Sequence, residues 1–358
     1  MRSLPQQRLA HLKISTQTAQ TPHQVVHHLG ALQAQDYLSM LWAVALRTPN
    51  ATEADIEQAI ADRQIVRTWP MRGTLHLVTA EDHRWWVQLM KPRIQSVMLN
   101  EKRLTSWGLD RALVYQAVDV IVKRLQGTQL TREELADALT QNGIDPSASR
   151  LSTFINTTIT EGWVCYGARR GKQHTFALVD EWLAPAPLLE REDALAELTK
   201  RYFTSHGPAT EQDFVWWTGL TLSDARLGIQ LAGGTLEKVT VAGTAYWMGT
   251  DHQDVKPEPL SVHLLPPFDE YLLGYAKRDA VLNPDHATKV APGKNGIFNP
   301  IIVIDGQVVG LWKRTLKPKK VIVQAIPFSL FTAEEEARIH AEFERYGKFL
   351  GLPLEIER

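Results

Sequence analysis

The chain has 358 residues and a net charge of −1, and it is longer than one hydrophobic core usually supports, so we expect two to four units. Its 44% apolar and 22% charged residues are typical of a globular protein, and no apolar run approaches the roughly 20 residues that span a bilayer. The single cysteine, Cys165, excludes an internal disulfide and a cysteine-rich zinc site. The first five residues lack the apolar core of a secretory signal, so we expect a cytoplasmic protein.

The first predicted unit covers residues 1–108. Helical spacing of apolar residues predicts helices over 5–12, 22–32, 53–61 and 80–104. A strand is predicted over 71–78, with Arg72, Thr74 and His76 on one face and apolar side chains on the other. These three side chains suit a surface that contacts phosphate and sugar, and the same alternation is also typical of an ordinary half-solvated strand.

The second predicted unit covers residues 109–185. Apolar spacing predicts three helices, over 112–125, 132–141 and 147–161. Thr131 and Glu134 have the spacing of a capping box at the start of the middle helix. Two predicted strands follow, over 163–166 and 175–178. Three helices and a hairpin in this order predict a winged helix.

The loop between these two strands is basic. It contains Arg169, Arg170 and Lys172 around a glycine. Cations at the tip of a wing suit contacts with phosphates, which position a duplex without reading its sequence. An ordinary solvated loop is the alternative interpretation.

The pattern recurs over residues 190–250, as a third predicted unit without a basic tip. Helices are predicted over 194–205, 210–217 and 222–231, and strands over 236–241 and 245–248. The last predicted unit, 255–358, is rich in strands, over 262–265, 296–298, 301–312 and 320–323, with a final helix over 333–349. Asp305-Gly306 is a strong hairpin turn signal. We expect this unit to be a small β-barrel.

The charge is segregated along the chain. Basic residues dominate 63–103, 169–172 and 313–320, whereas acids collect over 181–213 and in the last thirty residues. A net charge near zero does not indicate a nucleic-acid-binding protein, but this distribution is compatible with one basic channel.

The common catalytic signatures are absent from the sequence. It contains no glycine-rich dinucleotide or phosphate loop, no Gly-x-Ser-x-Gly and no His-Glu-x-x-His, so we expect no cofactor and no metal. Asp269-Glu270 and Arg278-Asp279 could hold a metal, and local salt bridges at strand ends explain them as well.

Two glutamines, Gln33 and Gln35, stand at the end of a predicted helix. Residues two apart point about 200° apart on a helix but share a face in an extended chain. For their amides to converge, the helix must end near Gln33 and the chain must be extended through Gln35, with a turn beginning at Asp36. By spacing alone, two solvated glutamines at a helix end explain the pattern as well.

Four segments in chain order resemble the AlkZ-like winged-helix DNA glycosylases. They are Leu-Gly-Ala-Leu-Gln-Ala-Gln-Asp (29–36), Ile-Val-Arg-Thr-Trp-Pro-Met-Arg-Gly-Thr-Leu-His-Leu-Val (65–78), Leu-Leu-Pro-Pro-Phe-Asp-Glu-Tyr-Leu-Leu-Gly-Tyr (264–275) and 296–314. The resemblance implies an α+β fold with tandem winged helices and a C-terminal β-unit around a DNA-binding channel. It further implies a monomeric, nucleoid-associated enzyme that acts on double-stranded DNA.

The same resemblance implies roles for the two glutamines. In the family a Gln-x-Gln motif positions the hydrolytic water, and here it falls on Gln33 and Gln35, whereas the related YcaQ branch has Asp in the second place. Members remove N7-alkylated purines, and some unhook interstrand crosslinks. It also implies phosphate contacts for the basic wing and for Arg72.

The chemistry of the carboxamide agrees with this substrate class. A carboxamide cannot accept a proton as a general base, so the two glutamines can only orient water and stabilise charge. Such a site suffices when the leaving base is already cationic, as N7-alkylguanine is. A winged-helix transcriptional regulator and a non-catalytic protein that binds lesions or a genotoxin are the alternatives.

Overall fold

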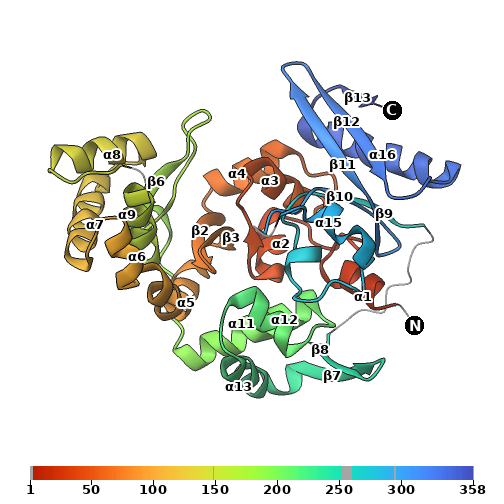
Figure 1. The fold of residues 1–358 in the computed structure, drawn as a ribbon, viewed down its shortest axis with the longest axis horizontal. Coiled ribbons are helices and arrows are strands. Elements are labelled where there is room, and N and C mark those ends of the chain that lie inside the picture. The colour runs from red at the N-terminus through yellow and green to blue at the C-terminus, as the bar shows by residue number, and fades with distance from the viewer. Residues whose placement is uncertain (1–2, 148, 252–259, 294–295, 358) are drawn as a thin grey trace. The chain divides into compact units, whose positions relative to one another are not determined.

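The computed structural model describes residues 3–147, 149–251, 260–293 and 296–357 (Figure 1). The chain forms two compact units, and both mix helices with strands, as the predicted α+β class requires. Unit 1 comprises Met1–Gln58, Ala196–Trp217 and Thr221–Arg358, and unit 2 comprises Ala59–Leu195 and Thr218–Leu220. The division into four segments made from the sequence stays a prediction.

Several helices of unit 1 begin at recognisable caps. They are α1 (Leu4–His11), α2 (Pro22–Leu29), α3 (Tyr37–Ala45), α12 (Glu211–Thr218), α13 (Leu222–Ala232), α14 (Glu270–Leu273), α15 (Ala287–Val290) and α16 (Ala333–Leu350). Helices α4 (Glu53–Ala61) and α11 (Arg191–His206) each run from one unit into the other. Ser3, Thr21 and Thr332 form capping boxes, whose side chains satisfy free amides of the first turn.

Helix α3 was not predicted. The sequence suggested a turn at Asp36, but this side chain caps a helix by accepting a hydrogen bond from the Ser39 amide at 2.9 Å. Seven consecutive residues of α3, Ser39 to Ala45, are buried. A helix that is apolar on every side has no amphipathic pattern, and so its periodicity could not reveal it.

The C-terminal strands form an open sheet, so the predicted β-barrel was wrong. The sheet has the order β13-β12-β11-β10-β9, with β9 (Val262–Leu265) at one edge and β13 (Leu354–Glu357) at the other. Between them lie β10 (Ile301–Ile304), β11 (Gln307–Lys317) and β12 (Lys320–Pro327). Helix α16 packs against the sheet through aromatic contacts such as Trp312–Tyr346, 5.1 Å between ring centroids. A helix that covers the apolar face removes the need for closure.

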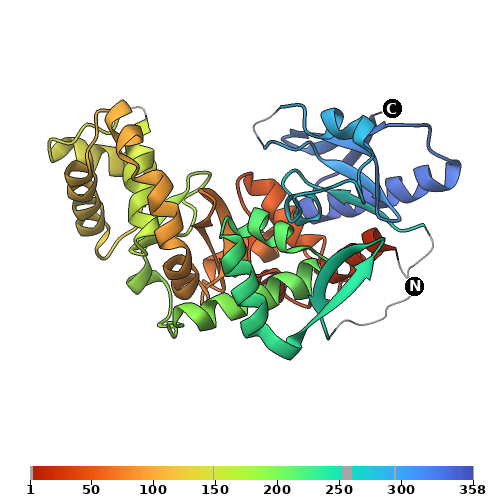
Figure 2. The same cartoon turned by 60° about the horizontal axis from the view of Figure 1, so that its bottom comes forward.

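Of two further predictions in this region, one is confirmed and one was wrong. The turn at Asp305-Gly306 is confirmed: β10 and β11 are antiparallel, and both turn residues have positive φ, 48° and 88°. The strand predicted over 296–298 was wrong, because these residues lie outside any strand. Figure 2 shows another hairpin of unit 1, formed by β7 (Leu236–Val241) and β8 (Thr244–Gly249), which matches its predicted bounds within one residue.

Unit 2 begins with a hairpin where one strand was predicted. Strand β2 (Ile65–Met71) turns at Arg72-Gly73 into β3 (Thr74–Thr79), so the strand predicted over 71–78 is confirmed over 74–78, whereas its first three residues belong to β2 and the turn. Arg72 has φ 51° and Gly73 has φ 69°, which the two-residue turn requires. The predicted helix over 80–104 is also divided, into α5 (His83–Met98) and α6 (Glu101–Ser106), because Asn100 caps the second helix.

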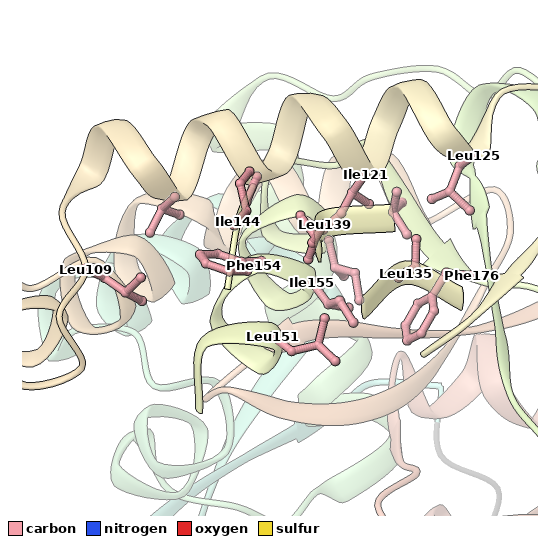
Figure 3. Packing of buried hydrophobic residues seen from close by; sticks show 14 of the residues in the cluster. Leu109, Ile121, Leu125, Leu135, Leu139, Ile144, Leu151, Phe154, Ile155 and Phe176 are labelled. Carbon is pink, nitrogen blue, oxygen red and sulfur yellow. The ribbon is translucent and has the colours of Figure 1, made fainter. Parts of the chain in front are cut away.

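The remainder of unit 2 matches the predicted order of helices and hairpin. It contains α7 (Arg111–Leu125), α8 (Arg132–Gln141), α9 (Ser149–Thr160) and α10 (Val179–Trp182), with β4 (Leu130–Thr131), β5 (Val164–Tyr166) and β6 (Thr175–Leu178) in the order β4-β6-β5. The capping box of Thr131 and Glu134 is confirmed. Figure 3 shows the core, in which Ile121 and Leu125 of α7 face Leu135, Leu139 and Ile155. This core fixes the hairpin β5–β6 to three helices.

Candidate functional site

The segment with the two glutamines is not helical and lies between two helices of unit 1, but it is extended only through Gln33, and Gln35 and Asp36 form a bend. Helix α2 ends at Leu29, three residues earlier than predicted, and Gly30 with φ 77° redirects the chain. Strand β1 (Leu32–Gln33) follows, and the next helix starts only at Tyr37. Gln33 is 8% exposed, whereas Gln35 is exposed to solvent. The backbone therefore has the non-helical form that convergence of the two amides requires, and the convergence itself stays a prediction.

A buried carboxylate holds the backbone of this segment. The amide of Gln33 donates to Glu270 Oε1 at 3.1 Å, and the Glu270 side chain is inaccessible to solvent. The other oxygen, Oε2, accepts from Trp217 Nε1 at 2.8 Å and lies 3.4 Å from His206 Nε2. Since Glu270 lies 237 residues from Gln33 in the chain, no local sequence signal could have revealed this contact.

The neighbouring carboxylates have partners of their own. Asp269 forms a buried bidentate ion pair with Arg47, at 2.8 and 2.9 Å. Asp36, besides capping α3, lies 3.2 Å from Arg314 Nη2. Asp269 thus forms a salt bridge, but the local salt bridge suggested by the sequence was wrong, because Arg47 lies 222 residues away in the chain. Glu270 has a hydrogen-bonding role that the sequence did not suggest.

Arg72, Thr74 and His76 do not share an exposed face. Arg72 occupies the β2–β3 turn, Thr74 is half-buried, and His76 is fully buried. Arg72 Nη2 lies 3.4 Å from His76 Nε2, and His76 Nδ1 lies 3.0 Å from the Thr74 carbonyl oxygen. The three residues therefore form one local group, in which the buried His76 contacts the guanidinium of Arg72.

The predicted wing residues have three different environments. Arg170 is exposed but pairs with Glu134 at 2.7 Å and donates to the Gln129 carbonyl at 2.8 Å. Arg169 is half-buried, and Lys172 is exposed at the tip. The capping amide of Thr131, and then the Arg170 guanidinium, lower the pKa of Glu134. Arg170 thereby ties the loop to the start of α8.

Arg67 and His174 form a polar pair beside hairpin β5–β6 that the sequence did not reveal. Arg67 is 5% exposed, its guanidinium lies 4.8 Å from the Tyr166 ring centroid, and its Nη1 contacts the His174 ring at 3.1 Å. Burial, and then the Arg67 charge, lower the pKa of His174 to about 4. The imidazole is therefore neutral near pH 7 and can accept from Arg67.

Within the described residues, no group of three or more His, Cys, Asp or Glu side chains has a geometry that would hold a metal ion. Over the same part of the chain, no helix has both the length and the apolar character to cross a membrane.

Comparison with known proteins gives one consistent result. A family model described as DNA glycosylase AlkZ-like matches residues 26–349. An interstrand DNA cross-link repair glycosylase of Streptomyces sahachiroi is 28% identical over 314 residues, which is 84% of each chain. The solved structure of the Streptomyces sahachiroi DNA glycosylase AlkZ is similar over 100% of both chains, with a TM-score of 0.81 and 25% identity.

Proposed function

Since this chain belongs to the AlkZ-like DNA glycosylase family, we propose that it hydrolyses the N-glycosidic bond of cationic N7-alkylated purines, with Gln33 and Gln35 orienting the attacking water. Family membership makes the chain a DNA glycosylase rather than a transcriptional regulator. The observation that supports the two glutamines is the non-helical segment between α2 and α3, which the buried Glu270 holds by the Gln33 amide.

The proposed catalyst is weak, and this weakness supplies its selectivity. A carboxamide donates and accepts hydrogen bonds but does not titrate in the useful pH range, so it leaves the water undeprotonated until the bond to the base breaks. N7-alkylation puts a positive charge on the purine, and cleavage relieves it. An undamaged base would need protonation to leave, which this motif does not provide.

Asp36 is the nearest alternative base in the sequence, but its carboxylate has other partners. It caps α3 through the Ser39 amide and pairs with Arg314. Its Oδ1 therefore already contacts the start of α3 and a guanidinium. We therefore assign the orientation of water to the two amides.

The DNA contacts are proposed for cations of unit 2. Helices α7 to α9 with the hairpin β5–β6 would form a winged helix, and its Lys172 and Arg169 would lie on phosphates of one channel. Arg170 would position the wing through Glu134. Arg72 would contact phosphate while His76 and Thr74 hold it. Such contacts position a duplex, and we expect a monomer on nucleoid DNA.

Crosslink unhooking belongs to the same proposal. The Streptomyces sahachiroi relative is named as a glycosylase of interstrand DNA cross-link repair. A lesion tied to both strands cannot be turned into a closed pocket in the usual way. A site that only orients water from an open channel is compatible with such a substrate.

The test uses a duplex with a single N7-methylguanine, and abasic sites are detected as strand breaks after alkali. The Gln33→Ala/Gln35→Ala variant should lose at least about 100-fold in single-turnover rate, the scale of removing a catalytic hydrogen bond. Gln88→Ala, which removes an exposed glutamine of α5, is the matched control and should keep the parental rate. Excision by the double variant at the parental rate would overturn the assignment. A parental protein that binds the lesion without excising it would indicate a non-catalytic relative.

A further inference from the structure

A second candidate site lies entirely within unit 2. It is a cavity of about 560 Å³, in the size range of small-molecule sites. Strand β2, its turn, helices α5, α6 and α9, and the loop over 218–220 all supply lining residues. The lining combines two tryptophans (Trp69, Trp107), three arginines (Arg72, Arg93, Arg103) and an apolar floor (Ile94, Val97, Met98).

The tryptophans give the cavity aromatic walls. Trp69 and Trp107 are both half-buried, and both pack against the helical core of unit 2. The guanidinium of Arg103 lies 4.8 Å from the Trp107 ring centroid. The core holds the indoles in place, so they can receive a flat ring at little entropic cost.

The arginines give the cavity a positive rim. Arg93 donates from Nε to the Gly219 carbonyl at 3.0 Å, and this bond holds its guanidinium at the wall. Arg93 and Arg103 are exposed residues, so their charges remain available to a ligand. Among the lining residues that the structure describes there are three arginines and no acid. The cavity therefore favours an anion.

The conformation of Arg72 supports a role in binding. Its φ of 51° is in the left-handed region, which costs a non-glycine residue roughly 1 kcal/mol and which Asn or Gly would fill more easily. Gly219 packs on it closely: a Cβ at this glycine would lie 3.3 Å from Arg72 Cγ. The turn thus places a long cation, held from two sides, at the wall of an aromatic cavity.

We propose that this cavity binds one unstacked nucleotide of a DNA strand, with the base on an indole and the phosphate on the arginines. Aromatic faces beside a basic rim are the chemistry by which proteins hold single-stranded nucleotides. Asn156 and Ser149 at the wall offer amide and hydroxyl groups to the edge of a base. The proposal rests on the proposed function only in that DNA is the source of the nucleotide; a free nucleotide has the same chemistry.

The probe is a trinucleotide with 2-aminopurine in the middle, whose fluorescence falls when its ring stacks on another ring. The parental protein should quench it saturably. Arg103→Ala and Trp107→Ala should weaken the apparent affinity about 5-fold or more, the lower end of the effect of losing a stacking contact. Arg124→Ala and Trp163→Ala remove exposed side chains of the same unit outside the cavity and should leave the affinity unchanged. Because Trp107 also packs on the core, Arg93→Ala provides a variant at an exposed position.

Three outcomes test the proposed nucleotide site. If Arg93→Ala and Arg103→Ala both quench the fluorescence with the affinity of the parental protein, the site is overturned. Equal affinity for 2-aminopurine mononucleotide and trinucleotide would overturn the strand as its source and assign a free nucleotide. The Gln33→Ala/Gln35→Ala variant should quench like the parent, because its changes lie in unit 1. Failure of the glutamine assignment and failure of this site are therefore seen in separate assays.

Discussion

Two hairpins of this protein each follow three helices, but only one of them has charged side chains at its tip. Hairpin β5–β6 follows α7 to α9, and its loop contains three cations, two of which lie beside Gly171. Hairpin β7–β8 follows α11 to α13, and its tip, residues 241–244, has no charged side chain. A third strand, β4, extends the first sheet, whereas the second has two strands.

The two hairpins are held to the rest of the protein at different places. In the first, the loop is tied to a helix by Arg170 and Glu134, and Lys172 remains exposed at the tip. Hairpin β7–β8 is instead held near its base, where Ala209 and Trp247 exchange two backbone hydrogen bonds, at 3.0 and 2.8 Å. We infer that β7–β8 contributes to the stability of unit 1 and β5–β6 contributes to DNA binding.

The largest expected effect concerns the base of β7–β8. A Cβ at Gly207 would lie 2.7 Å from Met248 Cβ and would also meet the Phe203 carbonyl, so Gly207→Ala must move backbone. We expect a loss of about 3 kcal/mol in the free energy of unfolding, measured by urea denaturation.

Gly171→Ala at the tip of the other hairpin is the matched control. Its φ is 63° and no atom lies within 4 Å of the added Cβ, so only backbone strain opposes it, at about 1 kcal/mol. If both variants lost the same free energy, the structural role of β7–β8 would have no support.

The stability of the protein should depend on pH through His174, which lies beside hairpin β5–β6. His174 has a pKa of about 4 in the folded protein because of burial and then Arg67, against about 6.5 in the unfolded chain. The unfolded chain therefore binds the extra proton between these values. Above about pH 6.5 His174 is neutral in both states and does not change the free energy of unfolding. As the pH is lowered from there toward 4, the unfolded chain binds a proton at His174 and the free energy of unfolding falls.

The measurement is an NMR titration of the His174 ring. Arg67→Met removes one of the charges that lower its pKa, so the pKa should rise toward its ordinary value, while Arg124→Met at an exposed position should not move it. A His174 pKa that stays near 4 in Arg67→Met would leave burial as the sufficient cause.

How far the sequence predicted these features depends on how local their causes are. The capping box of Thr131 and Glu134 and the turn at Asp305-Gly306 depend on a few adjacent residues, and both were predicted correctly. The β2–β3 turn was missed because Arg72 adopts a backbone conformation that its residue type rarely takes. The open sheet depends on α16 covering β9 to β13, which no periodicity encodes.

The candidate site shows the same limit. Spacing alone did not separate Gln33 and Gln35 from solvated glutamines, and the resemblance to a family drew attention to them. The contact that holds Gln33 comes from Glu270, far along the chain, and the pair of Arg67 and His174 joins β2 to the loop before β6, 107 residues away. Such contacts exist only once the units have folded.

The smallest expected effect is on the salt dependence of DNA binding, and it tests the comparison most directly. Each lost phosphate contact lowers the slope of log K against log salt by about one. Lys172→Ala should show this decrease on an undamaged duplex, because Lys172 is exposed at the tip of β5–β6. Thr244→Ala at the tip of β7–β8 removes an exposed side chain without charge and should leave the slope unchanged. Equal slopes for the parent and Lys172→Ala would mean that Lys172 binds no phosphate, and the exposed cation at the tip of β5–β6 would then not distinguish the function of the two hairpins.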